Sequence, residues 1–201
     1  EVLAQLENKA FNYLINLGGY IDHSNYFDGG KKTVNTHLDG VKNLVNFINK
    51  ESLICFIQIG SSDEYGDNPA PQSEDLRELP ISSYSLAKTA ATHFLQMLYI
   101  TENFPVVILR PFLVYGPGQN SNRFIPQIIN GCINNLDFPV SEGEQVRDFC
   151  YIDDIVDAIF LTLNNSKLHG EVFNIASGEP ISIKDVIIYI QKIIGLGKPL
   201  F

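Results

Sequence analysis

Apolar runs of strand length alternate with helix-period segments from one end of the chain to the other, and this alternation limits the folds open to it. The runs "LICFIQIG" (residues 53–60) and "FPVVILRPFLVYGPG" (residues 104–118) are almost continuously apolar, which is typical of strands buried on both faces of a parallel sheet. Segments such as "VNTHLDGVKNLVNFINK" (residues 34–50) carry apolar residues at helical spacing instead. The pattern predicts an α/β fold with a mostly parallel, doubly wound sheet.

The remaining segments fit the same alternation. Strands are expected within residues 11–19, 146–152 and 171–177, and helices around residues 82–98, 124–135, 153–165 and 182–195. Asp153 and Ser182 are the expected N-caps of the last two helices. Because ligands of doubly wound sheets gather beyond the carboxyl ends of the strands, the polar turns "LGG", "GSSDEYG" and "YGPGQN" mark the expected ligand crevice.

Composition restricts the partners and the compartment. The 14 basic and 23 acidic residues give a net charge of -9, which disfavours a nucleic-acid or anionic-membrane surface, so an anionic ligand needs a local site. Cys55, Cys132 and Cys150 are widely spaced and show no metal-binding pattern; they are interpreted as reduced, mostly buried thiols, and no metal site is predicted. With no apolar run near the ~20 residues of a membrane span and no signal-peptide layout, the predicted location is the cytoplasm.

Tyr84 and Lys88 lie four residues apart in "SSYSLAK", on one face of the expected helix. Such a spacing also arises by chance, and the two can be ordinary surface side chains. On a helical wheel, however, Lys88 lies at the edge of the apolar stripe, which favours a packed, functional lysine over a solvated one. An ammonium within ~4–6 Å stabilises a tyrosine phenolate, whose pKa is otherwise near ~10, and so suits the pair to proton transfer coupled to hydride transfer.

Ser61 and Ser62 directly follow a buried strand in "GSSDEYG" (residues 60–66). Their hydroxyl groups are therefore expected to face the ligand crevice, where a serine hydroxyl beside the tyrosine oxygen orients a substrate alcohol. The alternative is that both serines only form the turn hydrogen bonds that are common at strand ends.

Taken in order, "GSSDEYG", "YSLAK", "LRPFLVYGPGQ", "RDFCYIDD" and "FNIASGEPISI" resemble the extended short-chain dehydrogenase/reductase family, and within it the nucleotide-sugar epimerases, dehydratases and 4-keto reductases. The resemblance covers nearly the whole chain. It implies a Rossmann-like sheet that is incomplete because the first βαβ unit is missing. It also implies NAD or NADP as cofactor, a nucleotide-diphosphate sugar as substrate, and no nucleic acid or membrane as partner.

The resemblance also implies roles for individual residues. Tyr84 is the catalytic base, Lys88 positions it and binds the cofactor ribose, and Ser61 takes the serine/threonine place of the triad. The residues expected to bind the cofactor are Leu17, Gly18, Gly19, Asn35, Gly60, Ser61, Tyr84, Lys88, Pro111 and Leu113. Asn35 enters this set through the helix motif "N-x-x-G-x-x-N-L"; a helix asparagine that only caps its neighbours is the alternative. The residues expected to bind the substrate are Ser62, Asp63, Arg123 and Arg147, with both arginines near the diphosphate.

Residues 1–118 are expected to form a partial NAD(P)-binding domain, which contributes again around residues 147–165, and residues 119–201 a partial substrate-binding region. Asp148 and Asp153 are read as structural, through arginine pairing and helix capping. A homodimer of the full-length protein is expected, with the "SSYSLAK" and "VNTHLDG" helices at its interface.

The chain departs from the family in three places. It lacks the glycine-rich phosphate loop, and only ten residues precede the first strand whereas a βαβ unit needs ~30, so we expect an N-terminally truncated chain that binds dinucleotide poorly alone. Leu113 replaces a substrate-contacting asparagine. Asp63 stands at the place of the acid that dehydratases use but is shorter by a methylene, with Glu64 as its neighbour; dehydration is therefore possible but not indicated, and an epimerase or 4-keto reductase is favoured. A reductase of a non-nucleotide alcohol or ketone, and a non-catalytic dinucleotide sensor, are the alternatives.

Overall fold

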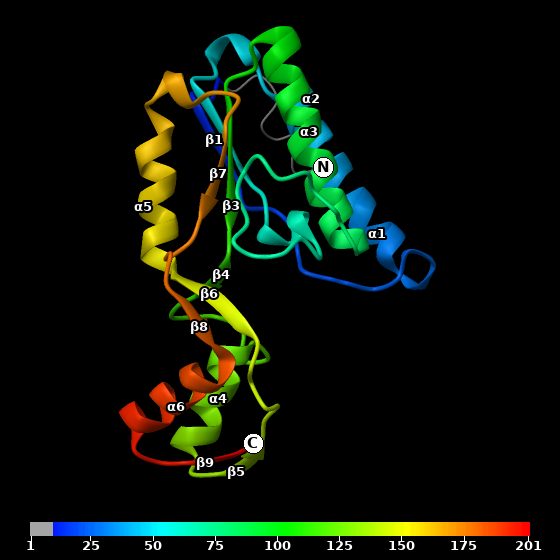
Figure 1. The fold of residues 1–201 in the computed structure, drawn as a ribbon. Coiled ribbons are helices and arrows are strands. Elements are labelled where there is room, and N and C mark those ends of the chain that lie inside the picture. Colours follow the sequence, from blue (N-terminus) through cyan, green and yellow to red (C-terminus); the bar gives the residue numbers. More distant parts are fainter. Residues whose placement is uncertain (1–9) are drawn as a thin grey trace. The chain divides into compact units, whose positions relative to one another are not determined.

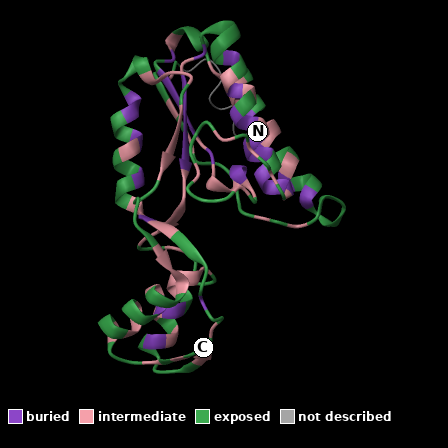
Figure 2. Ribbon diagram, in the orientation of Figure 1, coloured by how far each residue is buried: buried purple, intermediate pink, exposed green. Residues whose placement is uncertain are grey.

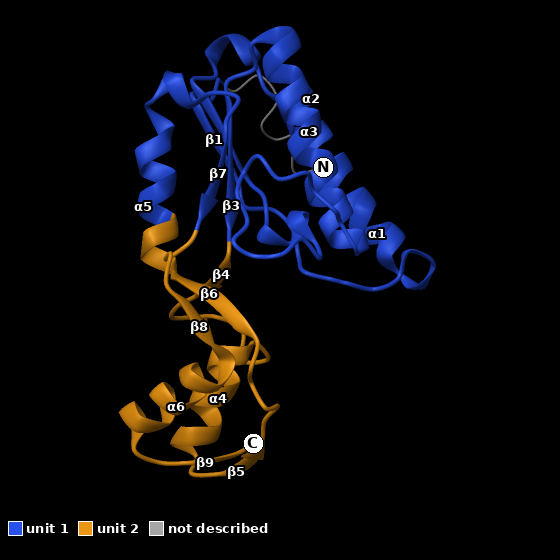
Figure 3. Cartoon of the chain, in the orientation of Figure 1, with its two compact units in different colours: residues 1–111, 156–175 blue, residues 112–155, 176–201 orange. Residues whose placement is uncertain are grey.

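The computed structural model describes residues 10–201 and divides the chain into two compact units (Figure 3). Of the described residues, unit 1 comprises residues 10–111 together with Val156–Ile175, and unit 2 comprises Phe112–Ile155 and Ala176–Phe201. The chain therefore passes from unit 1 to unit 2 at the end of a buried strand, seven residues before the boundary expected at residue 118.

Unit 1 is built on a four-stranded sheet (Figure 1). Its strands, in spatial order, are β1 (Tyr13–Asn16), β2 (Cys55–Ile59), β3 (Val106–Pro111) and β7 (Val172–Ile175). Every neighbouring pair is parallel, and the register pairs Phe56 with Val106 and Ile108 with Val172. The predicted parallel sheet is confirmed, because the continuously apolar segments form the two central strands, which need apolar side chains on both faces.

Helices cover both faces of this sheet (Figure 1). On one face lie α1 (Gly30–Val34), a π-helical turn (Asn35–Asp39), α2 (Gly40–Phe47) and the long α3 (Ser83–Glu102); on the other lies α5 (Ile152–Leu163). The first helical run starts at Gly30, four residues before the expected start. The assignment of Asp153 as an N-cap is wrong, because α5 begins at Ile152 and Asp153 lies inside its first turn.

One hydrophobic cluster of unit 1 lies between the sheet and the helices on the α3 side (Figure 2). Phe56, Leu95, Val106 and Ile108 are all fully buried there. Burying each such side chain is worth about 1.5–3 kcal/mol, so this layer fixes α3 against β2 and β3. The N-terminal end of α3 is thereby placed relative to the loop that follows β2.

Unit 2 is smaller and has shorter strands. Its elements are β4 (Leu113–Tyr115), α4 (Phe124–Ile133), β5 (Asp137–Pro139), β6 (Val146–Tyr151), β8 (Pro180–Ser182), α6 (Ile183–Ile194) and β9 (Lys198–Leu200). β6 pairs in parallel with β4 and antiparallel with β8, while β5 and β9 form a separate parallel pair. Ser182 accepts a hydrogen bond from the Asp185 amide, which confirms it as the N-cap of α6.

Short 3-10 turns at Tyr26–Asp28, Lys50–Ser52, Ser62–Tyr65 and Ser166–Leu168 complete the described elements. Cys55, Cys132 and Cys150 are all buried and free. None of the helices in residues 10–201 combines the length and the apolar character that crossing a membrane requires.

Candidate active site

The predicted catalytic residues belong to two neighbouring segments of unit 1. Ser61 follows β2 and caps the turn Ser62–Tyr65, where its Oγ accepts a hydrogen bond of 3.1 Å from the Asp63 amide. Its own amide donates a 2.9 Å hydrogen bond to Glu64 Oε1, which closes a capping box. The turn-forming role considered as an alternative is therefore present, and a hydroxyl that accepts one hydrogen bond can still donate its own proton.

Tyr84 and Lys88 are both buried in the first two turns of α3, with 6% and 7% of their surfaces exposed. Lys88 Nζ lies 5.7 Å from the centroid of the Tyr84 ring and donates a 2.8 Å hydrogen bond to the Ile59 carbonyl oxygen. Burial lowers the pKa of Lys88, while the nearby carboxylate of Glu64 acts in the opposite direction. The helical-wheel prediction of a packed lysine agrees with this burial.

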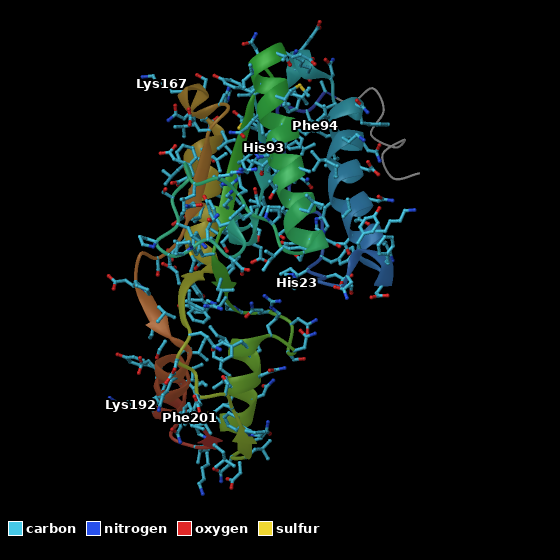
Figure 4. All side chains as sticks on the ribbon, turned by 45° about the vertical axis from the view of Figure 1, so that its right-hand side comes forward. His23, His93, Phe94, Lys167, Lys192 and Phe201 are labelled. Atoms are coloured by element: carbon cyan, nitrogen blue, oxygen red, sulfur yellow. The ribbon has the colours of Figure 1, made fainter. Side chains whose placement is uncertain are left out.

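Two histidines that are not among the predicted site residues lie against the Tyr84 ring. His23 and His37 make edge contacts with it, at centroid separations of 5.6 and 5.2 Å. His23 is the exposed one: it lies near the N-terminal end of α3 (Figure 4), with Nδ1 3.3 Å from Ser82 Oγ and Nε2 3.7 Å from Asp63 Oδ2. His37 is the buried one, with 5% of its surface exposed.

The loop after β1, residues 17–20, carries three of the predicted cofactor residues. Leu17 is 70% exposed, and the Gly18 amide donates a 3.0 Å hydrogen bond to Asn16 Oδ1. Gly19 has a φ of 139°, which favours glycine, and a Cβ at this position would lie 2.3 Å from the His37 ring. The loop backbone therefore rests directly on His37.

Asn35 is exposed, whereas His37, two residues later in the same π-helical turn, is buried beneath the loop. Counted from Gly40, Asn43 and Leu44, the place of the first asparagine in "N-x-x-G-x-x-N-L" falls on His37. His37 is thus the residue of this turn that contacts the loop, and a role of Asn35 toward the cofactor stays a prediction.

Gly60 directly follows β2, and Pro111 is the last residue of the neighbouring strand β3. A Cβ at Gly60 would lie 2.5 Å from Glu64 Oε1, so this turn closes only around a glycine. Glu64 is fully buried; its Oε2 accepts hydrogen bonds from Thr92 Oγ1 at 2.9 Å and from Arg110 Nε at 3.0 Å. A carboxylate with so many donors holds the turn in place and is not available to a substrate.

Arg110 is the centre of this buried network. Besides Glu64, its guanidinium group binds Glu78 Oε1 at 2.6 Å and the Tyr65 hydroxyl at 3.1 Å. Burial disfavours the charged form of Arg110, but Glu64, Glu78 and Tyr65 outweigh it and raise its pKa. Burial alone would raise the pKa of Glu78. The hydrogen bond and charge of Arg110 outweigh this effect, so the pKa of Glu78 lies below its usual value.

Unit 2 contains a cavity of about 600 Å³ that is lined by both predicted diphosphate-binding arginines, Arg123 and Arg147, and by Leu113. Arg147 is exposed, and its Nη1 donates a 2.8 Å hydrogen bond to the Val146 carbonyl oxygen. Gln119 also lines the cavity, and its buried Oε1 has no hydrogen-bond partner among the described residues. The lining thus offers two cations and one unused acceptor.

Asp148 has a structural role, but a different one from that expected. Instead of pairing with an arginine, its carboxylate accepts hydrogen bonds from the Ser177 amide and hydroxyl and from the Gly178 amide, at 2.7–2.9 Å. It therefore anchors the turn before β8.

Residues 1–176 match the NAD dependent epimerase/dehydratase family. The chain belongs to this family. Among curated proteins it is similar to the dTDP-D-glucose 4,6-dehydratase of Dictyostelium discoideum, at 30% identity over 94% of this chain and 46% of the relative. Several curated relatives are matched over 46–52% of their length, so the chain spans about half of them.

Solved structures of the family have the same fold as this chain. The UDP-glucuronic acid 4-epimerase of Bacillus cereus, in complex with UDP-glucuronic acid and NAD, superposes with a TM-score of 0.87 at 28% identity, over 100% of this chain and 65% of that one. RMD from Pseudomonas aeruginosa, complexed with NADPH, gives 0.88 at 26% identity, over 98% and 72%. The sheet is therefore of the Rossmann type, and the family is NAD(P)-dependent.

The residues of unit 1 fit part of such a cofactor. A buried lysine and a serine hydroxyl at the end of a parallel strand suit the ribose and nicotinamide portion. The exposed glycine loop after the adjacent strand β1 suits the adenosine ribose and pyrophosphate side. Among residues 10–201, no cluster of three or more histidine, cysteine or acidic side chains could hold a metal ion.

Proposed function

We propose that the protein containing this chain is an NAD(P)-dependent epimerase, 4-keto reductase or dehydratase of a nucleotide-diphosphate sugar. The observation that carries the proposal is the buried pair of Tyr84 and Lys88 at the start of α3, beside the Ser61 turn. Burying a lysine costs free energy, because its charge loses hydration. Lys88 is buried beside Tyr84 of the same helix and against the end of β2, and such a buried charge is typical of a functional site.

In this proposal a bound NAD(P) accepts and returns the hydride at C4 of the sugar. The chain's own residues handle the proton of the sugar hydroxyl. Tyr84 removes it as a phenolate base, the ammonium of Lys88 stabilises the phenolate, and the hydroxyl of Ser61 orients the sugar oxygen. Lys88 keeps its place because it is hydrogen-bonded to the Ile59 carbonyl.

Within the group of three reactions, epimerisation or 4-keto reduction is the better supported. Dehydration needs a carboxylate that acts on the sugar. Glu64 is buried and its oxygens already accept hydrogen bonds from the Ser61 amide, Thr92 and Arg110. The remaining acid of this turn is Asp63, which is one methylene shorter than a glutamate and lies 3.7 Å from His23 Nε2, so this turn favours dehydration less.

Arg123 and Arg147 are proposed to bind the diphosphate of the substrate. Both line the cavity of unit 2, and a guanidinium group suits a diphosphate because it can donate two parallel hydrogen bonds. This cavity supports a nucleotide-linked substrate over a simple alcohol or ketone, which would need no such cations.

The full-length protein is proposed to form a homodimer through its α3 face. Leu86, Met97 and Ile100 of this helix are 48%, 43% and 77% exposed, so the helix presents apolar side chains to solvent as well as to the core. Sedimentation of the full-length protein tests this proposal, and a monomer would contradict it.

The test of the reaction is Tyr84→Phe in the full-length protein. Loss of the acid–base group lowers turnover of a nucleotide-diphosphate sugar by about 10²–10⁴-fold, while cofactor affinity stays close to that of the wild type. Tyr99→Phe, on the same helix and 37% exposed, is the matched control. Unchanged turnover of the Tyr84 variant overturns the proposal.

A further inference from the structure

His37 occupies the middle of the π-helical turn Asn35–Asp39 and makes contacts in two directions. Toward the loop after β1, its Nε2 lies 2.8 Å from the Tyr20 carbonyl oxygen. Toward α3, its ring meets the Tyr84 ring in an edge arrangement with an interplanar angle of 85°. π-helical turns occur frequently at functional sites, because they alter the direction in which a side chain points.

The contact with the loop is close enough to determine its path. The Gly19 backbone lies against the imidazole ring, at a distance that leaves no room for a side chain. Tyr20 also packs on His37, with ring centroids 5.5 Å apart. The position of residues 17–20 therefore depends on the ring of His37 as well as on its hydrogen bond.

Two backbone groups of Tyr20 lie near His37 Nε2: the carbonyl oxygen at 2.8 Å and the amide nitrogen at 3.4 Å. A carbonyl oxygen only accepts, so the shorter contact is a hydrogen bond when the proton is on Nε2. Burial lowers the pKa of His37, the hydrogen bond to the Tyr20 carbonyl acts against this, and the charge of Lys88 lowers the pKa further. Tyr84 and Tyr20 are the other titratable groups against the ring. The lowered pKa and the shorter contact with the Tyr20 carbonyl together favour a neutral ring with its proton on Nε2.

We propose that His37 is a positioning residue that couples the predicted cofactor loop to the catalytic tyrosine. Its Nε2–H holds the Tyr20 carbonyl and so fixes residues 17–20, and its ring fixes the orientation of Tyr84. The inference rests on the proposed function, since it assigns the loop to the cofactor and Tyr84 to the proton. The first position of the motif "N-x-x-G-x-x-N-L" is an asparagine, whose side chain ends in an amide. The histidine at this position in the present chain has a ring that contacts Tyr84.

Two substitutions separate the two contacts. His37→Phe keeps a ring against Tyr84 but removes the donor to Tyr20, so KM for NAD(P) rises about tenfold while kcat changes little. His37→Gln keeps a side-chain N–H donor but removes the ring, so kcat falls about tenfold with KM for NAD(P) close to the wild type. A purely structural histidine would not divide the two parameters in this way.

His169→Gln is the matched control. His169 also lies in unit 1, burial lowers its pKa as well, and it is remote in sequence from the 17–20 loop and α3. This variant retains both kinetic parameters. Equal changes of kcat and KM in both His37 variants, accompanied only by a lower melting temperature, overturn the proposal, as does wild-type behaviour of both.

A second measurement does not depend on turnover. Nitrogen-15 NMR of imidazole-labelled full-length protein, without cofactor, distinguishes the tautomers, and it should show a neutral His37 ring protonated at Nε2 at pH 7. A ring protonated only at Nδ1, or a charged ring, overturns the proposal. If the NMR result holds but the wild type turns over no nucleotide-diphosphate sugar, the proposed function has failed and the contact of His37 with the loop has not.

Discussion

Lys88 Nζ donates a 2.8 Å hydrogen bond to the main-chain carbonyl of Ile59, the last residue of β2. This bond joins the second turn of α3 to the strand that leads into Ser61. It holds the ammonium group at a fixed place beside the Tyr84 ring, where the side chain is almost fully buried. The orientation of the proposed catalytic pair is thus fixed by the backbone of the sheet and not by a flexible ion pair.

Replacing this lysine with an uncharged chain of similar length tests its electrostatic role. In Lys88→Met the phenolate loses its nearest cation, so turnover at pH 7 falls by about 10²-fold or more, and the rise of kcat/KM with pH moves to higher pH. The pH–rate profile of the full-length protein measures both. Lys42→Met, in which an exposed lysine paired with Asp39 is lost, is the control. An unchanged profile in Lys88→Met contradicts the role.

The Glu64–Arg110 pair is expected to determine the stability of unit 1. Both side chains are fully buried, with Arg110 NH2 2.8 Å from Glu64 Oε2. Arg110→Met leaves the Glu64 carboxylate unpaired in the interior and should lower the free energy of unfolding by about 3–5 kcal/mol. Urea denaturation measures this change.

The exposed Arg77 provides the control for this pair, since Arg77→Met should change stability by less than about 0.5 kcal/mol. In the double variant Glu64→Gln/Arg110→Met both fully buried charges are gone, and the half-buried Glu78 retains His93 Nε2 at 3.3 Å. The stability loss of the double variant should therefore be smaller than the sum of the two single losses. Simple additivity would show that the two groups act independently.

The sheet was predictable because its central strands need apolar side chains on both faces, and the runs around Phe56 and Val107 supply them. The strands β5, β8 and β9 were not, because three residues are too few to show a period of two. Their positions follow from tertiary pairing, such as that of Asp137 with Lys198, which leaves no local signal.

The candidate site was predictable where a residue type and its spacing carry the chemistry, as for Tyr84 and Lys88. It was missed where packing decides. His37 was passed over because the first asparagine of the motif was placed at Asn35, whereas counting back from Gly40 places that position at His37. Arg110 was passed over because it lies within an apolar run, although a charged residue inside a buried strand requires acidic partners. Glu64 and Glu78 are those partners, and only the fold brings them together.

Arg147 is expected to contribute more than Arg123 to nucleotide binding, because it was the more specific match to the family motif. UDP, dTDP, CDP and GDP are tested for their effect on the melting temperature of the full-length protein, and at least one should raise it. Arg147→Ala should weaken that nucleotide's affinity by about tenfold or more, since a charge-assisted hydrogen bond is lost. Arg77→Ala is the control. Failure of all four nucleotides supports a non-nucleotide substrate instead.

His37 should make stability depend on pH on the acidic side of neutrality. Its pKa in the folded state lies below the usual 6.5, chiefly because of burial, with Lys88 adding to the effect and the Tyr20 carbonyl opposing it. Between these two values the unfolded chain binds more protons than the folded one. The free energy of unfolding therefore rises with pH in this window, and stability is lost as the pH falls below about 6.5.

His37→Gln removes the titrating group, so its urea-unfolding free energy should fall less than that of the wild type between about pH 7.5 and 5. Burial lowers the pKa of His169 too. His169→Gln should therefore also reduce the fall of the unfolding free energy between about pH 7.5 and 5, and the double variant should reduce it further. Because the two residues are far apart in sequence and belong to different contacts, their effects should add. If the unfolding free energy of His37→Gln falls as much as that of the wild type over this pH range, His37 has the same proton affinity in the folded and unfolded chain, contrary to its burial under the Gly19 loop.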